Sequence, residues 1–295
     1  MTKLTIVVNC TERKSHVPSP QLQVRNLPDG TLGDRIKNWQ RRLQDATPTC
    51  TLVDLYKGEA WQQVRGLVGD VTNSGFEVRL LVASAGLGLQ DAYSKAPAYA
   101  ATFAGGHQDT VASPGLASQL WWKALEAFEG SGSLVETTDE RVLLVLSENY
   151  ARAMENDLVA LAKRGGDLLL VGGARDIKGL PRLAADMGLR RQLGGTASSI
   201  TLRMARRWLA NSGNHTLYDA TKGRRWSKWA ASVSELERYD RKPAEDTEIR
   251  ALIRQLKAED PSLSATRALR RVRDSGVACE QKRFGRLFHS TEVTR

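Results

Sequence analysis

Residues 4–14 read LTIVVNCTERK, a short apolar run that ends in a cluster of reactive and charged side chains. The apolar part predicts a buried strand over Leu4–Val8. In an open parallel sheet, ligands bind in the crevice beyond the carboxyl ends of the strands. A turn that only reverses the chain would favour Gly, Pro, Asn or Asp, whereas this one carries a carboxylate, a thiol, a hydroxyl group and two cations. The loop is therefore a candidate ligand site, with a solvated, charged loop as the alternative.

The first 190 residues alternate between short apolar runs and amphipathic patterns with helical spacing. Strands are expected at residues 4–8, 51–55, 78–83, 142–146 and 168–171. Helices are expected around residues 32–43, 61–71, 116–128, 150–161 and 180–187. Strands that alternate with helices predict a three-layer α/β fold with a mostly parallel sheet.

The positive charge is concentrated in the last third of the chain. Residues 1–200 hold 22 Lys and Arg against 21 Asp and Glu, whereas residues 201–295 hold 21 against 12, within a total net charge of +10. Such asymmetry favours a polyanionic partner, most simply double-stranded DNA. The alternative is a solvated helical surface rich in Arg.

The remaining composition indicates a globular protein without a bound metal or other cofactor. Cys10, Cys50 and Cys279 are far apart, form no CxxC pair and are odd in number, and the chain has four histidines. The apolar runs are too short to span a bilayer, and the first residues do not have the pattern of a signal peptide. We expect a cytoplasmic protein of 295 residues, a monomer with one large or two modest domains.

A second loop of small residues follows the strand expected near Leu80. It reads Ser84-Ala85-Gly86-Leu87-Gly88, and small side chains let a ligand approach the backbone closely. A single Gly-x-Gly is a weak phosphate-binding signal, so a tight strand-to-helix turn is the alternative.

Several motifs occur in an order that resembles a widespread bacterial family of unknown-function domains. They are NCTERK (9–14), DLYKGEAW (54–61), SAGLGL (84–89) followed by YAATF (99–103), and LSENY (146–150). The family is related to the uracil-DNA-glycosylase-like fold, and the resemblance covers about residues 1–190. This chain departs from the family pattern at Leu87, where the family usually has Tyr, and at Asn9, which precedes the Cys.

The resemblance implies one pocket at the carboxyl ends of the strands. Its lining would be Cys10, Thr11, Lys14, Ser84, Tyr99, Thr102 and Tyr150. The family recurs beside phage-defence genes and enzymes that handle deazaguanine bases, which implies a modified base such as a glycosylated cytosine of phage DNA. The late strand near residue 170 resembles that of uracil-type glycosylases, and Arg175 after it would hold a departing base or a phosphate, or would simply be a surface residue.

Cleavage of an N-glycosidic bond needs a group that stabilises a cationic sugar and donors for the leaving base. Glu12 or Asp91 is the candidate for the first role, with Asn9 as a positioning partner. Ser84, Tyr99 and Tyr150 are candidates to frame the base. No lysine stands in a setting that predicts a Schiff base, which favours an enzyme that stops at the abasic site.

A break at Gly194-Gly195 divides the predicted α/β domain (1–193) from a basic helical region (194–295). The two glycines open a helix and predict an anion site for a DNA phosphate, or a simple hinge. Further on, basic and aromatic residues are interleaved in a pattern that suits phosphate contact with stacking or a wedge into DNA, or packing onto the main domain. They are Lys222, Arg224, Arg225, Trp226, Lys228 and Trp229.

The last module, residues 244–295, resembles a helix-turn-helix. Helices are expected at 249–257, 264–274 and 280–288, around a small core of Leu269, Val272, Val277, Phe284 and Leu287. Gln281, Lys282 and Arg286 would then face outward, as on a recognition helix. The alternative is a helical cap on the main domain.

The leading hypothesis from these patterns is a DNA glycosylase of phage defence that leaves an abasic site. The alternatives are a non-enzymatic DNA-binding or stress-response protein, and a hydrolase or transferase of free modified nucleotides.

Overall fold

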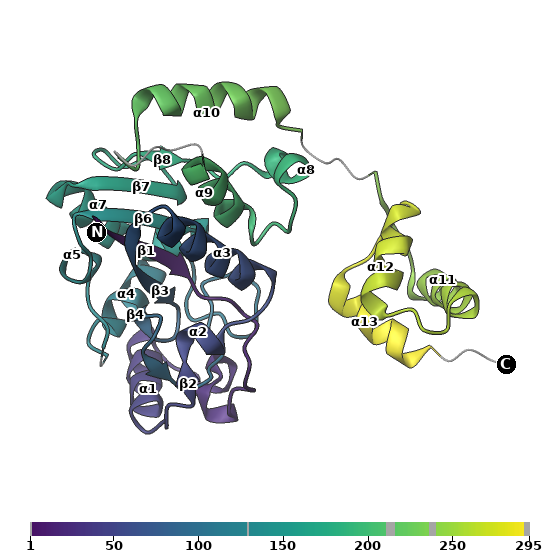
Figure 1. Cartoon of the computed structure of the whole chain (residues 1–295). Coiled ribbons are helices and arrows are strands. Elements are labelled where there is room, and N and C mark those ends of the chain that lie inside the picture. Colours follow the sequence, from purple (N-terminus) through teal and green to yellow (C-terminus); the bar gives the residue numbers. More distant parts are fainter. Residues whose placement is uncertain (1, 129, 211–215, 236–239, 292–295) are drawn as a thin grey trace. The chain divides into compact units, whose positions relative to one another are not determined.

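The computed structural model of the chain describes residues 2–128, 130–210, 216–235 and 240–291 (Figure 1). The chain divides into two compact units, residues 1–236 and 237–295. The domain boundary expected after residue 193 is therefore wrong. Helices that follow that point still belong to the first unit, because their apolar faces pack on its core.

The first unit is built on a six-stranded sheet in the order β4-β3-β1-β6-β7-β8, within the described residues. β1 (Thr2–Asn9), β3 (Phe76–Ser84), β6 (Arg141–Leu146), β7 (Asp167–Gly172) and β8 (Arg182–Leu183) are parallel. β4 (Gly88–Asp91) is an antiparallel strand at one edge. Four of the five predicted strands are confirmed, and their central residues are buried as expected for strands covered on both faces.

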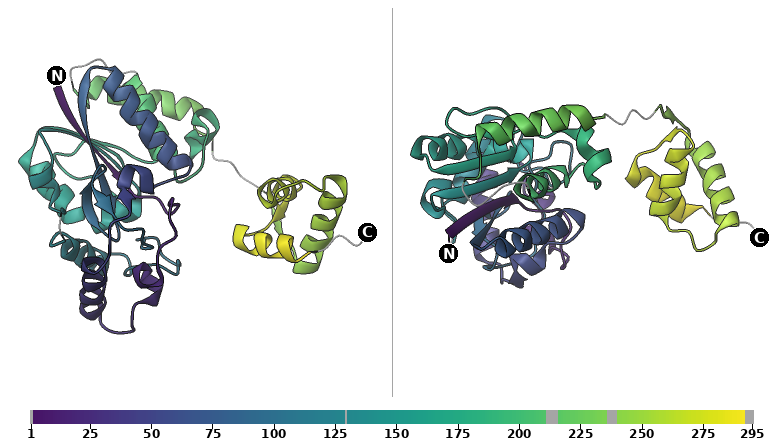
Figure 2. Two further views of the ribbon diagram at one scale, coloured as in Figure 1. Left: turned by 60° about the horizontal axis from the view of Figure 1, so that its bottom comes forward. Right: turned by 45° about the horizontal axis from the view of Figure 1, so that its top comes forward.

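Helices cover both faces of this sheet. The connection from β1 to β3 contains α3 (Glu59–Asn73), which packs against α9 (Ile200–Ala210). The connections from β3 to β6 and from β6 to β7 run the opposite way along the sheet and contain α4 (Leu116–Leu125), α6 (Glu148–Ala153) and α7 (Glu155–Arg164). Because such crossovers are right-handed, the reversal puts these helices on the other face. The expected α/β fold with a mostly parallel sheet is confirmed, and helices on both faces are compatible with three layers (Figures 1 and 2).

Further elements complete the first unit. They are η1 (Pro20–Leu22), η2 (Val24–Asn26), α1 (Leu32–Gln44), α5 (Leu134–Thr137) and α8 (Arg190–Leu193). The helix expected over 150–161 is divided into α6 and α7 at Met154.

The strand expected at residues 51–55 is wrong. Only Cys50–Thr51 form a short strand, β2, which pairs with β5 (Lys95–Ala96), and α2 (Leu52–Leu55) follows at once. Leu52 and Leu55 are both fully buried. They are three residues apart, so a helical turn puts them on one side. The run of apolar residues therefore reflected one buried helical face.

The helix expected at residues 180–187 is also wrong. β8 extends the sheet there, and η3 (Met187–Leu189) follows it. Pro181 explains the difference, because a proline disfavours the helical conformation of the residue before it. The carbonyl of Pro181 instead accepts a hydrogen bond of 2.9 Å from the amide of Leu170 on β7.

The second unit is a small helical module with its own core. The three predicted helices are confirmed as α11 (Asp246–Glu259), α12 (Ala265–Asp274) and α13 (Gln281–Ser290). Two short strands, β9 (Lys242–Pro243) and β10 (Val277–Ala278), pair with each other in the same unit. Of the predicted core, Leu269, Val272, Phe284 and Leu287 are buried and Val277 is partly buried. The arrangement of α12, a tight turn at Gly276 and α13 is compatible with a helix-turn-helix.

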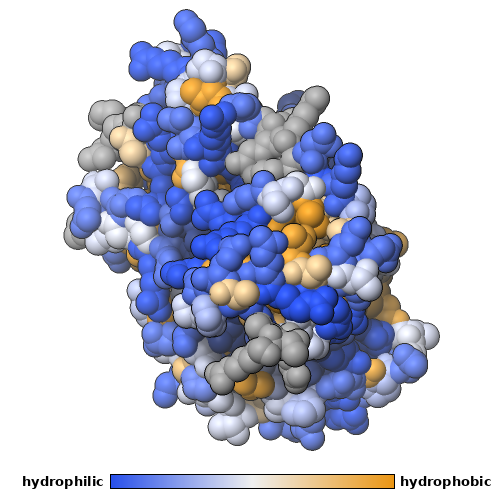
Figure 3. All heavy atoms as spheres, turned by 90° about the vertical axis from the view of Figure 1, so that its right-hand side faces the viewer, coloured by the Kyte–Doolittle hydropathy of each residue, from blue (hydrophilic) through white to orange (hydrophobic). Residues whose placement is uncertain are grey.

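The surface is mostly hydrophilic on the face that Figure 3 presents, and its hydrophobic residues lie in small patches. Among the described residues, no helix has both the length and the apolar character needed to cross a membrane.

Candidate functional site

A cavity opens beyond the carboxyl ends of β1 and β6. β1 lies between β3 and β6 in the sheet. The chain crosses from β1 to β3 in one direction along the sheet, and from β3 to β6 and β7 in the other direction. In open α/β sheets, ligands bind where the direction of the crossovers reverses in this way. The cavity has a volume of about 410 Å³, within the range of ligand pockets. Seven of the residues expected at a site line it: Cys10, Thr11, Glu12, Lys14, Tyr99, Thr102 and Tyr150.

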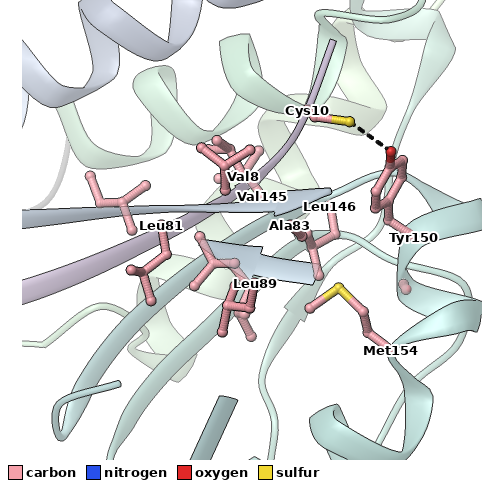
Figure 4. Close-up of a cluster of buried hydrophobic side chains, with 14 of the residues drawn as sticks. Val8, Cys10, Leu81, Ala83, Leu89, Val145, Leu146, Tyr150 and Met154 are labelled. Carbon is pink, nitrogen blue, oxygen red and sulfur yellow. Dashed lines mark hydrogen bonds between the residues drawn. The ribbon is translucent and has the colours of Figure 1, made fainter. Parts of the chain in front are cut away.

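Asn9, the last residue of β1, and Cys10, the next residue, contact the start of α6 after β6. The Cys10 thiol lies 2.9 Å from the Tyr150 hydroxyl group, as Figure 4 shows. The Oδ1 atom of Asn9 accepts a hydrogen bond of 3.0 Å from the amide of Ser147. Asn9 therefore holds the two loops together, and its hydrogen bonds do not support the expected role as positioning partner of Glu12.

Three buried hydroxyl groups form a hydrogen-bonded chain beneath the cavity. The Tyr99 hydroxyl lies 2.6 Å from Ser84 Oγ and 2.7 Å from the Tyr56 hydroxyl. Ser84 Oγ also accepts hydrogen bonds from the amides of Gly86 and Leu87, so Ser84 donates its own proton to Tyr99. Burial raises the pKa of both tyrosines well above the usual value, and the phenols are neutral at pH 7.

The glycine at position 86 is required by this arrangement. A Cβ atom there would lie 2.5 Å from a ring carbon of Tyr99. The small residues of the second loop thus make room for a tyrosine that lines the cavity. This observation favours neither a phosphate nor another ligand at the backbone of the loop.

Lys14 reaches into the cavity wall across the Tyr99 ring. Its Nζ atom lies 4.4 Å from the centroid of that ring, and it donates a hydrogen bond of 3.2 Å to the Thr11 carbonyl. Burial lowers the pKa of Lys14, and the electrostatic effect of Cys10, Glu12 and Asp109 opposes this shift. A larger share of this amine is uncharged at neutral pH than for an exposed lysine.

A carboxylate–imidazole pair forms another part of the cavity wall. His107 Nε2 lies 3.3 Å from an oxygen of Glu12. The amide of Asp109 donates to His107 Nδ1 at 3.1 Å. This bond requires a lone pair on Nδ1, so the neutral ring carries its proton on Nε2 and donates it to Glu12.

Arg25 and Asp109 hold the histidine in place from behind. Asp109 is almost fully buried and receives hydrogen bonds from the amide and the guanidinium group of Arg25. Sequence reasoning missed Arg25, His107 and Asp109, all of which line the cavity. His107 and Asp109 lie just beyond the motif at 99–103, but no spacing rule indicated that this segment returns to Glu12.

Two predicted site residues lie away from the cavity. Asp91 is at the end of the edge strand β4, where its carboxylate lies 3.6 Å from Arg79. Arg175 is exposed and forms an ion pair with Glu155. Ser84 and Asn9 are adjacent to the cavity but do not line it. The geometry therefore leaves Glu12 as the carboxylate of choice and does not support catalytic use of Asp91.

The predicted anion site at Gly194-Gly195 already holds a carboxylate of the protein. Both glycines have positive φ, +73° and +83°, and end α8 before α9 begins at Ile200. Glu59 accepts hydrogen bonds there from the Thr196 hydroxyl at 3.1 Å and from Arg203 Nη2 at 2.7 Å. These glycines do not open the helix, and their geometry does not support a DNA phosphate site.

The two tryptophans of α10 (Ala220–Val233) pack against the core of the first unit, to which α10 belongs. Trp226 packs edge-on against Trp208, with ring centroids 5.7 Å apart, and Trp229 lies 4.9 Å from Trp226. Both rings are partly buried against the core, which favours packing over a wedge into DNA. Arg224, Arg225 and Lys228 are exposed on the same helix.

On α13 of the second unit, the three predicted contact residues are exposed. They are Gln281, Lys282 and Arg286. Arg286 lies 4.0 Å from Asp246, at the edge of ion-pair distance, so its guanidinium group stays accessible.

Comparisons with family models, with curated proteins and with solved structures gave no match for this chain. In the described part of the chain, no three His, Cys, Asp or Glu side chains are grouped as metal ligands would be.

Proposed function

We propose that this protein is a DNA glycosylase that removes a modified base, such as a glycosylated cytosine of phage DNA, and leaves an abasic site. The observation that carries the proposal is the cavity at the carboxyl ends of β1 and β6. It combines neutral phenols, a lysine amine and a carboxylate–imidazole pair in a volume of about 410 Å³. A flipped nucleotide needs a pocket of this kind, with hydrogen-bonding groups and flat faces.

Glu12 is the group that would meet the reacting sugar. Breaking the N-glycosidic bond makes the sugar cationic, and a fixed carboxylate stabilises that charge or orients a water molecule. The hydrogen bond from His107 Nε2 restrains the Glu12 carboxylate on the side of the cavity. The Glu12 side chain is 81% exposed, so the bound DNA must cover it before its charge acts at full strength.

The leaving base would find its donors on the other walls. The Lys14 amine can neutralise negative charge on the departing base, and the thiol–phenol pair of Cys10 and Tyr150 lies at the same end of the sheet. The neutral state of the tyrosines suits a base-binding role, because a neutral phenol donates a hydrogen bond that a phenolate cannot.

DNA binding is supported by basic surfaces in both units. Residues 201–236 contain seven Lys and Arg against two Asp and Glu. Residues 220–233, the range of α10, contain four of these cations and no acidic residue. α12 and α13 of the second unit add exposed Arg and Lys side chains. Such surfaces bind the phosphate backbone with a strong dependence on salt.

The direct test is incubation of the protein with unmodified DNA and with DNA of phages that carry modified cytosines, followed by mass spectrometry of the released bases. The Glu12→Gln variant should bind DNA normally and release the base at least about 100-fold more slowly, as is typical when a positioned charge is lost. Glu77→Gln is the matched control, because Glu77 is an exposed carboxylate on β3 outside the cavity lining.

Three outcomes would contradict the proposal in different ways. Tight DNA binding without base release from any substrate would favour the non-enzymatic DNA-binding protein. Release from free modified nucleotides alone would favour the nucleotide hydrolase. Equal rates for the wild-type protein and Glu12→Gln would remove Glu12 from the mechanism.

A further inference from the structure

The Lys14 amine has the position of a nucleophile at the cavity. Its Nζ atom lies 4.4 Å from the ring centroid of Tyr99 and 5.7 Å from that of Tyr56. It donates hydrogen bonds to two backbone carbonyls, at 3.2 Å to Thr11 and at 3.5 Å to Glu12. Two aromatic rings and the loop of residues 11–14 thus hold this amine at the cavity wall.

Lys14 is partly desolvated and is not held as an ammonium ion by a carboxylate of the described chain. Among the described residues, no carboxylate oxygen lies within ion-pair distance of Nζ. Burial lowers the pKa of Lys14. A desolvated lysine of this kind is the type of residue that forms Schiff bases with carbonyl substrates. No lysine in the sequence indicated such a setting, because Tyr56 and Tyr99, which supply the burial, lie far along the chain.

We infer that Lys14 is the nucleophile of a second reaction, in which this protein cleaves a DNA strand at an abasic site. The inference rests on the proposed function only for the origin of that site, since base excision leaves a deoxyribose whose ring-opened form carries an aldehyde at C1′. An amine that lines the cavity where the base was held is placed to reach that carbon.

The reaction needs no oxidant, reductant or metal. The Nζ lone pair adds to C1′, and loss of one water molecule gives a protonated imine. A base removes a proton from C2′, and the electron pair of that bond forms the C2′–C3′ double bond while the 3′-phosphate leaves. Water then hydrolyses the imine, which restores the amine and releases an unsaturated aldehyde at the 3′ end of one fragment. Glu12 lines the same cavity and is the candidate base for the C2′ proton.

The test uses the full-length protein and an oligonucleotide duplex with one preformed abasic site. Sodium borohydride reduces the imine to a stable amine, so a covalent protein–DNA adduct should appear on a denaturing gel. Peptide mass spectrometry should locate the adduct on Lys14. In Lys14→Arg, which keeps the charge, adduct formation and strand cleavage should each fall at least tenfold.

A matched control and a separate assay keep the result interpretable. Lys57→Arg is the control, because Lys57 is exposed and its backbone amide donates a hydrogen bond to the Arg13 carbonyl in the loop that carries Lys14. This variant should form the adduct at the wild-type rate. Circular dichroism verifies that both variants are folded. An adduct that persists in Lys14→Arg, or no adduct with the wild-type protein, overturns the inference.

Base release is measured on the same preparations with base-modified DNA. Base release without an adduct leaves the glycosylase proposal standing and overturns the role of Lys14. A Lys14-dependent adduct on preformed abasic sites without base release supports the role of Lys14 and contradicts the proposed function.

Discussion

At the residue scale, neighbouring side chains at the end of β1 have different structural roles. Asn9 bonds to Ser147 and Cys10 contacts Tyr150 on the segment that follows β6, whereas Glu12 and Lys14 line the cavity, as Cys10 also does. The first two therefore fix the distance between the loops that form the site. The sequence placed all four in one reactive cluster. Only the structure shows that Asn9 does not line the cavity, whereas Cys10 lines it and also contacts Tyr150.

The residues of the site were predictable to the extent that they follow directly after predicted strands or lie in a quoted motif. Cys10, Glu12 and Lys14 follow β1, and Tyr150 follows β6. Asp91 does not line the cavity, because the edge strand β4 runs antiparallel to β3 and ends away from the cavity. The pairing of His107 with Glu12 joins residues 95 positions apart in the sequence, and no local pattern encodes it.

Asp157 on α7 gives a prediction about stability and pH. It is buried and accepts a hydrogen bond of 3.0 Å from Trp122 Nε1, and burial raises its pKa. Because the folded state binds this proton more tightly than the unfolded state, the charged form costs stability above the raised pKa, and that cost falls as the pH decreases through it. Asp157→Asn keeps an acceptor for Trp122 and should raise the melting temperature at pH 7.

Thermal unfolding of the wild-type protein and Asp157→Asn at pH 7 and at pH 4 checks this prediction. The difference in melting temperature should be smaller at pH 4, because more of the wild-type carboxyl groups are neutral there than at pH 7. A variant less stable than the wild-type protein at pH 7 would mean that the ionised carboxylate is a net stabilising group.

At the element scale, helices that look like additions to the α/β domain are part of it. α9 packs against α3, and Arg203 on α9 pairs with Glu59, the first residue of α3. The two glycines before α9 misled the sequence reasoning, because two flexible residues before a helix suit a domain boundary as well as a turn inside a domain. Nothing local in the sequence indicated that the carboxylate of Glu59 would meet this turn.

The shortest strands and helices were also not predictable from local sequence patterns. β1, β3, β6 and β7 were predictable because they are apolar runs buried on both faces. α2 and β8 were not, because four residues or fewer are too short to establish a period.

Trp226 on α10 should now be tested as a packing residue. Its ring contacts Trp208 and Trp229 and is partly buried. Trp226→Ala should lower the free energy of unfolding by about 2–4 kcal/mol, somewhat less than for a fully buried aromatic residue. DNA affinity of the folded fraction should stay within about twofold of wild type. Urea unfolding and DNA titration at a temperature where the variant is folded measure the two effects.

Arg225→Ala, one residue before Trp226, is the control with the opposite expectation. Arg225 is exposed, so its removal should leave the melting temperature nearly unchanged and weaken DNA binding. A stable Trp226→Ala variant with greatly reduced affinity would restore the wedge hypothesis.

At the scale of the whole molecule, two separate cores imply two separable folding units. One hydrophobic core lies in the first unit, residues 1–236. The other lies in the second unit and includes Ile249, Ile253 and Phe284. The sequence predicted the last module correctly, because its helices are amphipathic and its core is local. It placed the main boundary too early, since α9 and α10 depend on contacts with distant strands and helices.

Removal of residues 237–295 should therefore leave the first unit folded. Its melting temperature should change by no more than about 2 °C, because its core is complete without the second unit. DNA affinity should fall, and the slope of the logarithm of affinity against the logarithm of salt concentration should become shallower by about 0.9 for each lost phosphate contact. Calorimetry and salt-dependent DNA titration provide the measurements, and an unchanged slope would assign DNA binding to the first unit alone.

The central place of β1 in the sheet also affects how the protein is made. Thr5 pairs with Val142 on β6, and Thr2 pairs with Phe76 on β3, so the earliest strand must wait for partners synthesised much later. At a translation rate of about 5–20 residues per second, β6 follows β1 after about 7–30 s. During that interval an apolar segment emerges from the ribosome without its neighbours. Nascent chains of this protein should accordingly be substrates for ribosome-associated chaperones until β6 emerges.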